Sequence, residues 1–262
     1  MARDLGPLTR RIRARAALGV CVAALALGGT ALTALTSPPG ASAQDKPAGH
    51  DVSSHQKNVD WAAAKSRGAT FVYVKATEST SYRNPYFGQQ YDGARRAGLV
   101  RGAYHFAVPD QSSGRAQADF FAANGGGWRS DGWTLPPAVD LEHNPYGKDA
   151  KGGSGDTCYG LSPAEMTAWV AGFSDQMRLR TGRRPAIYTT TAWWNRCTGN
   201  SRAFAAEHPL WLARYATTPG ALPAGWSYWT VWQHANGSGR LPGDQNLFNG
   251  TFAQLKRFAA GR

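Results

Sequence analysis

The fold is decided by the stretch TFVYVKATESTSYRNPYFGQQYDGARRAGLVRGAYHFA, residues 70–107. Residues 70–76 form an apolar run rich in β-branched and aromatic side chains, which is typical of a buried strand. Residues 86–98 predict a helix that ends at a glycine, and residues 99–107 form a second apolar run. A helix between two such strands favours parallel pairing, with the helix covering the sheet.

The same alternation of apolar runs and helical stretches extends to both sides of this unit. Further strands are predicted in HDVSS (50–54), PPAVDLE (136–142), RPAIYTT (184–190), LWLARYA (210–216) and YWTVWQH (228–234). Further helices are predicted in NVDWAAAKSRG (58–68, capped by Asn58), GRAQADFFAAN (114–124), LSPAEMTAWVAGFSDQMRLRTG (161–182) and TFAQLKRFAA (251–260). The longest helix carries a capping box, Ser162 with Glu165, and ends at Gly182. We expect an α/β fold: an irregular, TIM-barrel-like (β/α) barrel that loses its regularity near the C-terminus, where helices run out.

The first 43 residues have the pattern of a secretory signal peptide. Five arginines precede the apolar run AALGVCVAALALGGTALTAL (16–35), and the small-residue sequence ASA ends at Ala43. A membrane anchor is the alternative, but the apolar run is poor in large side chains. We therefore expect a secreted protein, with a signal peptide at 1–43, a short linker at 44–48 and one catalytic barrel domain at 49–262.

Removal of residues 1–43 would take away five arginines and Asp4, and would lower the formal net charge from +12 to +8. A basic extracellular protein associates readily with anionic polymers, among them acidic wall polymers, peptidoglycan carboxylates and stray nucleic acid. Charge alone does not choose between these partners.

Two cysteines, Cys158 and Cys197, remain in the predicted mature chain. In an oxidising compartment such a pair predicts one disulfide, with two free thiols as the alternative. The sequence contains neither a CxxC nor an HExxH spacing, so we expect no metal site and no catalytic cysteine.

Two acids end the predicted fourth strand, in the sequence PPAVDLEHNP (136–145). Side chains alternate along a strand, so Asp140 and Glu142 point to the same side. Close carboxylates cannot both ionise easily, and one can keep a proton and serve as a general acid in glycoside hydrolysis. The alternative is a structural role, in pairing with arginine or in helix capping. Asp51 in the first strand and Asp244 in the last segment are the other acids expected at this end of the barrel.

Aromatic residues and one histidine are further candidates for substrate binding. Sugar rings pack on aromatic planes, and tyrosine hydroxyls reach sugar hydroxyls. Most such residues nevertheless fill protein cores. His105 ends a predicted strand and is equally compatible with a place in the site or with a buried, hydrogen-bonded role. The candidates are Tyr104, His105, Tyr188, Trp211 and Tyr215.

Seven segments in register resemble the family 25 glycoside hydrolases, secreted muramidases of the Chalaropsis lysozyme type. They are GHDVSSHQKNVDW, VRGAYHFAVP, PAVDLEHNPYG, TCYGLSPAEM, RPAIYTTTAWWNRCTGN, LWLARYA and VWQHANGSGRLPGDQNLFNGT. The resemblance covers residues from about 49 to the C-terminus. Within the family, the chain resembles the secreted bacterial N,O-diacetylmuramidases in particular. One departure is KDAKGGSGD (148–156), which looks like an insertion.

The resemblance implies an irregular barrel without a cofactor that cleaves the β-1,4 bond between N-acetylmuramic acid and N-acetylglucosamine, including 6-O-acetylated muramic acid. It implies that Glu142 is the proton donor, and that Asp140 orients the 2-acetamido group or stabilises charge. Asp51 and Asp244 correspond to the family's other site acids, and Cys158 and Cys197 to paired cysteines. The expected partners are peptidoglycan and anionic wall polymers, with no nucleic acid and no membrane after signal removal, and we expect a monomer.

Two other functions share some of these features. A barrel glycosidase acting on chitin-like polymers would share the acids and aromatics but not the DVSS and GDQN segments. A non-catalytic wall-binding protein would be expected to have lost an acid, whereas all four acids are present here.

Overall fold

The computed structural model describes residues 46–146 and 156–262. The predicted signal peptide and nearly all of the predicted insertion at 148–156 lie outside the described residues.

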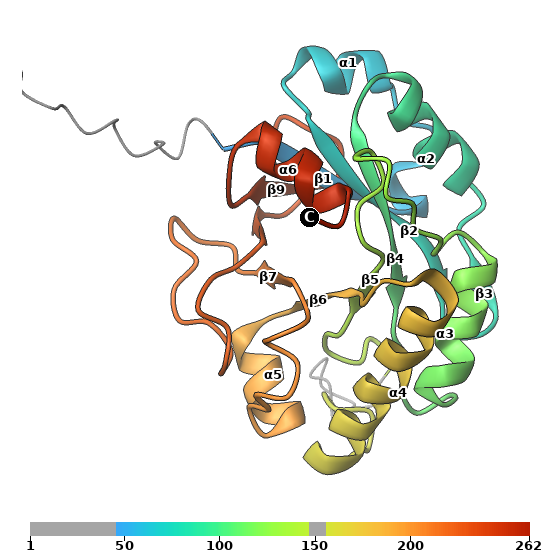
Figure 1. Ribbon diagram of the computed structural model, residues 1–262, viewed down its shortest axis with the longest axis vertical. Coiled ribbons are helices and arrows are strands. Elements are labelled where there is room, and N and C mark those ends of the chain that lie inside the picture. Colours follow the sequence, from blue (N-terminus) through green and yellow to red (C-terminus); the bar gives the residue numbers. More distant parts are fainter. Residues whose placement is uncertain (1–45, 147–155) are drawn as a thin grey trace, which may run out of the picture. The chain divides into compact units, whose positions relative to one another are not determined.

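Eight strands close a barrel in the order β1, β9, β8, β7, β6, β5, β4, β2, because β1 also pairs with β2 (Figure 1). Neighbouring strands are parallel from β1 through β2, β4, β5, β6 and β7 to β8, whereas β9 is antiparallel to both β8 and β1. The short β3 (Tyr82–Arg83) pairs antiparallel with β2. The barrel strands are β1 (Ala48–Val52), β2 (Phe71–Glu78), β4 (Val100–Phe106), β5 (Ala138–Asp140), β6 (Ala186–Thr189), β7 (Leu210–Ala213), β8 (Val231–Ala235) and β9 (Asp244–Phe248). The expected irregular (β/α) barrel is confirmed.

Helices follow the strands in the first part of the barrel and become sparse after β7. Figure 1 shows α1 to α4 around one flank, whereas loops connect β7, β8 and β9. The helices are α1 (Trp61–Ser66), α2 (Phe87–Arg96), α3 (Gly114–Ala123), α4 (Pro163–Thr181), α5 (Thr191–Thr198) and α6 (Phe252–Ala259), with a 3-10 turn at Ser54–Gln56. None of the helices in the described part of the chain has the length and apolar character needed to cross a membrane.

Large aromatic side chains fill the barrel interior. The Trp211 ring stacks on Tyr73 with 4.6 Å between centroids and meets Tyr104 and Tyr188 edge-on. Each fully buried side chain of this kind contributes roughly 1.5–3 kcal/mol to folding. A second apolar layer lies between the strands and α3 to α5, where Phe121 and Phe173 are fully buried. The interior is therefore a packed core, and chemistry is confined to its ends.

Several local predictions hold and others need correction. The capping box of α4 and the left-handed Gly182 at its end are as expected. However, α1 is capped by Asp60, whose Oδ1 accepts from the Ala63 amide at 2.9 Å, and not by Asn58. Strand β9 and helix α5 were not predicted.

Candidate active site

The four predicted acids lie at one rim of the barrel. Asp51 and Asp140 stand at the carboxyl ends of β1 and β5, and Glu142 follows β5 by two residues. Asp244 begins β9, but β9 runs in the opposite direction, so its first residue faces the same rim. The Cα atoms of Asp51 and Asp244 are direct antiparallel partners. All four acids line a cleft of about 350 Å³, together with Lys75, Tyr104 and Phe106.

Gly243 allows the loop before β9 to approach β1. Its φ is +76°, a left-handed conformation that a glycine adopts without strain. An added Cβ would collide with the carbonyl oxygen of Asp51. The glycine in the GDQN segment therefore sets the distance at which Asp244 faces Asp51.

Two side-chain amides hold the Asp51 carboxylate. Its Oδ2 accepts from Gln233 Nε2 at 2.8 Å and from Asn246 Nδ2 at 2.7 Å. Burial and the nearby charge of Asp244 raise the pKa of Asp51 to about 7, against the two hydrogen bonds that lower it. Gln233 and Asn246 were missed in the sequence, although Gln233 follows Trp232 in β8 and Asn246 lies in the polar start of β9.

Three aromatic side chains fix the orientation of these amides by donating hydrogen bonds to their oxygens. Tyr188 and Tyr215 both donate their hydroxyls to Gln233 Oε1, at 2.8 and 3.0 Å. The Trp211 indole donates to Asn246 Oδ1 at 2.7 Å. Since both amide oxygens are occupied as acceptors, both amide nitrogens must point towards Asp51.

Asp140 and Glu142 are neighbouring carboxyls whose pKa values are both raised. Burial, followed by the charge of Glu142, raises the pKa of Asp140 well above its usual range. Burial also raises the pKa of Glu142, against the opposing effects of His143, whose Nδ1 lies 2.9 Å from Oε2, and of Lys75. Among the described residues no group donates to the buried Oδ1 of Asp140. Two adjacent carboxyls with raised pKa values can share one proton, which is the requirement for general acid catalysis.

Lys75 is a cleft residue that sequence reasoning missed. It lies within β2, its Nζ is 2.5 Å from Glu78 Oε2, and the same atom is 4.6 Å from the Phe106 ring centroid. Glu78 also accepts from the Tyr146 hydroxyl. A lysine inside a β-branched run was the available signal, since charged side chains are rarely buried without a partner.

Two predicted substrate-binding residues do not reach the cleft. His105 is fully buried on the outer side of β4, where its ring nitrogens lie 2.8 Å from Thr77 Oγ1 and 2.9 Å from Gln117 Oε1. Burial lowers the pKa of His105 to about 4, so its role is that of a neutral core histidine. Trp211 is only 2% exposed and lies beneath the rim, between Tyr73 and the amide of Asn246. It supports the site from below.

The three tyrosines occupy different depths. Tyr104 lines the cleft, whereas Tyr188, the Cα partner of Asp140, is buried just below it. Tyr215 is 55% exposed at the rim and is also hydrogen-bonded to Asp244. Of the three, Tyr104 and Tyr215 are placed to meet a ligand.

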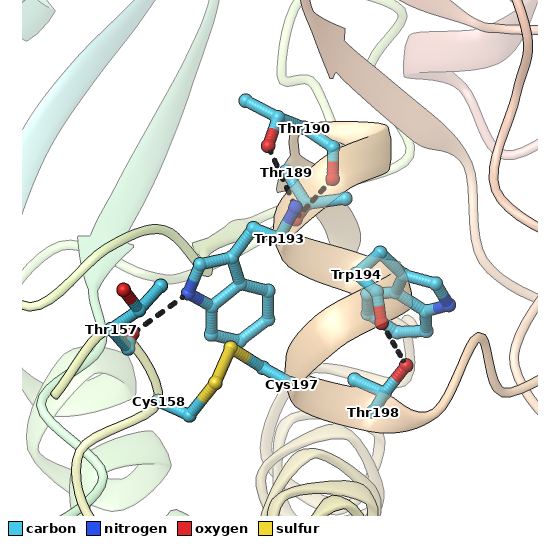
Figure 2. The surroundings of a disulfide bond; sticks show 8 residues. All are labelled: Thr157, Cys158, Thr189, Thr190, Trp193, Trp194, Cys197 and Thr198. Carbon is cyan, nitrogen blue, oxygen red and sulfur yellow. Dashed lines mark hydrogen bonds between the residues drawn. A yellow bond between two sulfur atoms is a disulfide. The ribbon is translucent and has the colours of Figure 1, made fainter.

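The Cys158–Cys197 disulfide is present, as predicted (Figure 2). It ties the segment after β5 to helix α5, at a sequence separation of 39. Beside it, the Trp193 indole donates to the Thr157 carbonyl oxygen at 3.1 Å. The chain that continues from Glu142 is thus anchored again at α5.

No cluster of three or more histidine, cysteine or acidic side chains in residues 46–146 and 156–262 could hold a metal ion.

Known proteins are similar to this chain in sequence and in fold. The model of the family described as Glycosyl hydrolases family 25 matches residues 50–244, a range that contains all four acids. An N,O-diacetylmuramidase from Chalaropsis sp is 49% identical over 217 residues, covering 81% of this chain and 99% of that protein. Lysozyme M1 from Streptomyces globisporus is 45% identical over 216 residues, covering 80% and 70%. The structure of a muramidase from Acremonium alcalophilum superposes with a TM-score of 0.78 at 48% identity, covering 83% and 100%.

Proposed function

Because the chain belongs to the family 25 glycosyl hydrolases, we propose that it cleaves the β-1,4 bond between N-acetylmuramic acid and N-acetylglucosamine in peptidoglycan. The observation that carries the proposal is the Asp140–Glu142 pair, in which burial raises both pKa values at the rim of the barrel. Glu142 is the proton donor to the leaving oxygen, because it is the less buried of the two and lines the cleft. The names of the relatives from Chalaropsis and Streptomyces support this substrate class.

Substrate binding loads the proton onto Glu142. In the free protein burial favours a proton on Asp140, whose Oδ1 lacks a donor among the described residues. An acetamido N–H of the sugar next to this oxygen would supply the missing donor and favour ionised Asp140. The new negative charge then raises the pKa of Glu142 and keeps the proton there. Asp140 therefore orients the acetamido group and switches on the acid.

The sugar's own acetamido oxygen is the nucleophile in this scheme. Its attack on C1 displaces the leaving oxygen, to which Glu142 gives its proton, and ionised Asp140 stabilises the developing positive charge. Asp51 and Asp244 complete the acidic floor of the cleft. A carboxylate nucleophile is the competing mechanism. Covalent labelling of Asp140 or Asp51 by a 2-deoxy-2-fluoro glycosyl inactivator would contradict acetamido participation.

The finer substrate and cellular assignments belong to the same proposal. The chain accepts 6-O-acetylated muramic acid, as the name of the relative from Chalaropsis indicates for that protein. It is exported, loses residues 1–43 and acts as a cofactor-free monomer outside the cell. Its positive charge attracts it to anionic wall polymers. Since salt screens such attraction, its rate on intact walls should fall as ionic strength rises, whereas its rate on a short soluble substrate should not.

The decisive experiment compares the mature protein with Glu142→Gln on purified O-acetylated peptidoglycan, with mass spectrometry of the new termini. We expect muramic acid at the new reducing ends and a loss of about a hundredfold or more in the variant. The control is Glu165→Gln, which removes an exposed carboxylate from the start of α4. Intact walls with the wild-type protein, followed by cleavage of chitin oligomers, would favour the chitin-type alternative. Intact walls and oligomers alike would favour a binding protein.

A further inference from the structure

A second cavity opens at the end of the barrel opposite the catalytic cleft. It has a volume of about 350 Å³. Its lining comes from residues that precede the parallel strands β6, β7 and β8, such as Arg183, Pro209 and Thr230, and from Asn249, which follows antiparallel β9. The strands between the two openings have four or five residues, which at about 3.3 Å per residue separates them by roughly 15 Å of packed core.

Two aromatic side chains make this cavity unlike the core around it. Tyr228 is 64% exposed, and Trp229 beside it is partly buried. Eight of the ten tryptophans donate their indole N–H to a protein oxygen. Only Trp133 and Trp229 lack such a bond within the described residues, and Trp133 is covered by Arg95 and Lys256. Trp229 thus offers a ring and an unused donor to the cavity.

The cavity also holds positive charge that no acid neutralises. Arg183 makes no ion pair within the part of the chain that the structure describes. Lys46 is not part of the lining but contacts two lining residues: its Nζ donates to Asn249 Oδ1 at 2.8 Å and lies 5.3 Å from the Trp229 ring centroid. The one acid of the lining, Glu207, is bound to Arg184 at 2.7 Å. An entering anion would therefore meet the Arg183 guanidinium, with Lys46 beside the lining residues Asn249 and Trp229.

We propose that this cavity is a second binding site for peptidoglycan glycan, with Tyr228 and Trp229 stacking on sugar rings and Arg183 and Lys46 meeting their carboxylates. The class of ligand follows from chemistry: aromatic planes with hydrogen-bonding amides recognise sugars, and unpaired cations select sugars that bear acids. The assignment of peptidoglycan as that sugar polymer rests on the proposed function. The two sites lie at opposite ends of the barrel. A glycan chain bound in the cleft therefore leaves this cavity open to a neighbouring glycan chain.

The test measures binding and catalysis separately. In the Glu142→Gln background, co-sedimentation with purified peptidoglycan sacculi gives Kd without cleavage. We expect Tyr228→Ala and Trp229→Ala to weaken binding by about five- to tenfold, and Arg183→Gln to weaken it at low salt. The matched controls are Leu179→Ala, an exposed apolar residue of α4, and Arg196→Gln, an exposed arginine of α5. Neither should change Kd by as much as twofold.

In the active background, Tyr228→Ala should lower the rate on sacculi and leave kcat/KM on a soluble tetrasaccharide of the two amino sugars unchanged. Equal Kd for Tyr228→Ala and its parent would overturn the second site, even if Trp229→Ala fails to fold. That result would leave the proposed function intact as long as the wild-type protein cleaves the tetrasaccharide. Failure to cleave the tetrasaccharide would instead reject the proposed function.

Discussion

At the scale of single residues, the ionised form of Asp140 that the proposed mechanism needs lowers the stability of the folded protein. Its pKa is raised above the unfolded value, so the folded protein binds its proton more tightly than the unfolded chain does. The ionised form consequently costs stability as the pH rises above the unfolded pKa. We expect Asp140→Asn to increase the free energy of unfolding by about 1–3 kcal/mol at pH 8 and to abolish activity. Urea unfolding at pH 8 and pH 3 checks this, because the gain should vanish at pH 3, where both states are protonated. A gain of equal size at both pH values would contradict it.

Lys75 also shifts the pKa values of the same two carboxyls, Asp140 and Glu142. Its positive charge lowers the pKa values of Asp140 and Glu142, against burial. In Lys75→Met both pKa values rise, so Glu142 stays protonated to higher pH. We expect the alkaline limb of kcat/KM on a soluble tetrasaccharide to move to higher pH, with a smaller loss of kcat than the hundredfold loss from removal of the acid. The control is Lys65→Met on the exposed surface of α1. An unmoved alkaline limb would contradict the role of Lys75.

Strand alternation explains which site residues could be predicted from the sequence. Asp140 and Glu142 are two apart, and both line the cleft, although β5 ends at Asp140 and the predicted strand extended to Glu142. Tyr104 and His105 are adjacent in β4, so only one of them could face the barrel interior. The alternation did not say which one, because both faces of β4 are buried. Gln233 was not predictable as a site residue, since its role depends on a contact with Asp51 182 residues away.

At the scale of elements, the parallel βα units were predictable and the last part of the barrel was not. Each early strand is an apolar run bounded by a helix with a recognisable start or end. In β9 the sequence DQNLF lacks β-branched residues, because its polar side chains serve the rim. In α5 the sequence TAWWNRCT carries aromatic residues with modest helix propensity, and the helix is fixed by the Thr190 cap and the disulfide.

Gly243 links the geometry of β9 to the site. Gly243→Ala adds a Cβ that collides with Asp51 and also forces a left-handed residue, so we expect a loss of at least about 2 kcal/mol in stability together with reduced activity. The matched control is Gly68→Ala, where φ is +95° but no atom lies within 4 Å of the added Cβ. Gly68→Ala should cost about 1 kcal/mol and leave kcat unchanged. Urea unfolding and kcat for both variants check this, and equal effects would contradict the collision.

At the scale of the whole molecule, the disulfide stabilises the closed barrel. Linking Cys158 to Cys197 restrains a loop of about 40 residues in the unfolded chain, which contributes about 2–4 kcal/mol. For a domain of this size we expect reduction, or the Cys158→Ser/Cys197→Ser variant, to lower Tm by about 4–16 °C. Thermal unfolding with and without reductant measures this, and the double variant should show no response to reductant. A wild-type Tm that reductant does not change would contradict the prediction.

The double pairing of β1, with β2 on one side and β9 on the other, makes the order of chain synthesis matter. The ribosome releases β1 early and β9 late, so the ring of strands stays open until residues 244–248 emerge. The donors that orient Asp51 arrive with β8 and β9, and Asp244 is itself part of the closing strand. A nascent or prematurely terminated chain consequently has an unpaired strand edge and no assembled set of acids. The pairing of β9 that completes the fold is thus also the step that assembles the cleft, so a chain that lacks β9 is expected to have no hydrolytic activity.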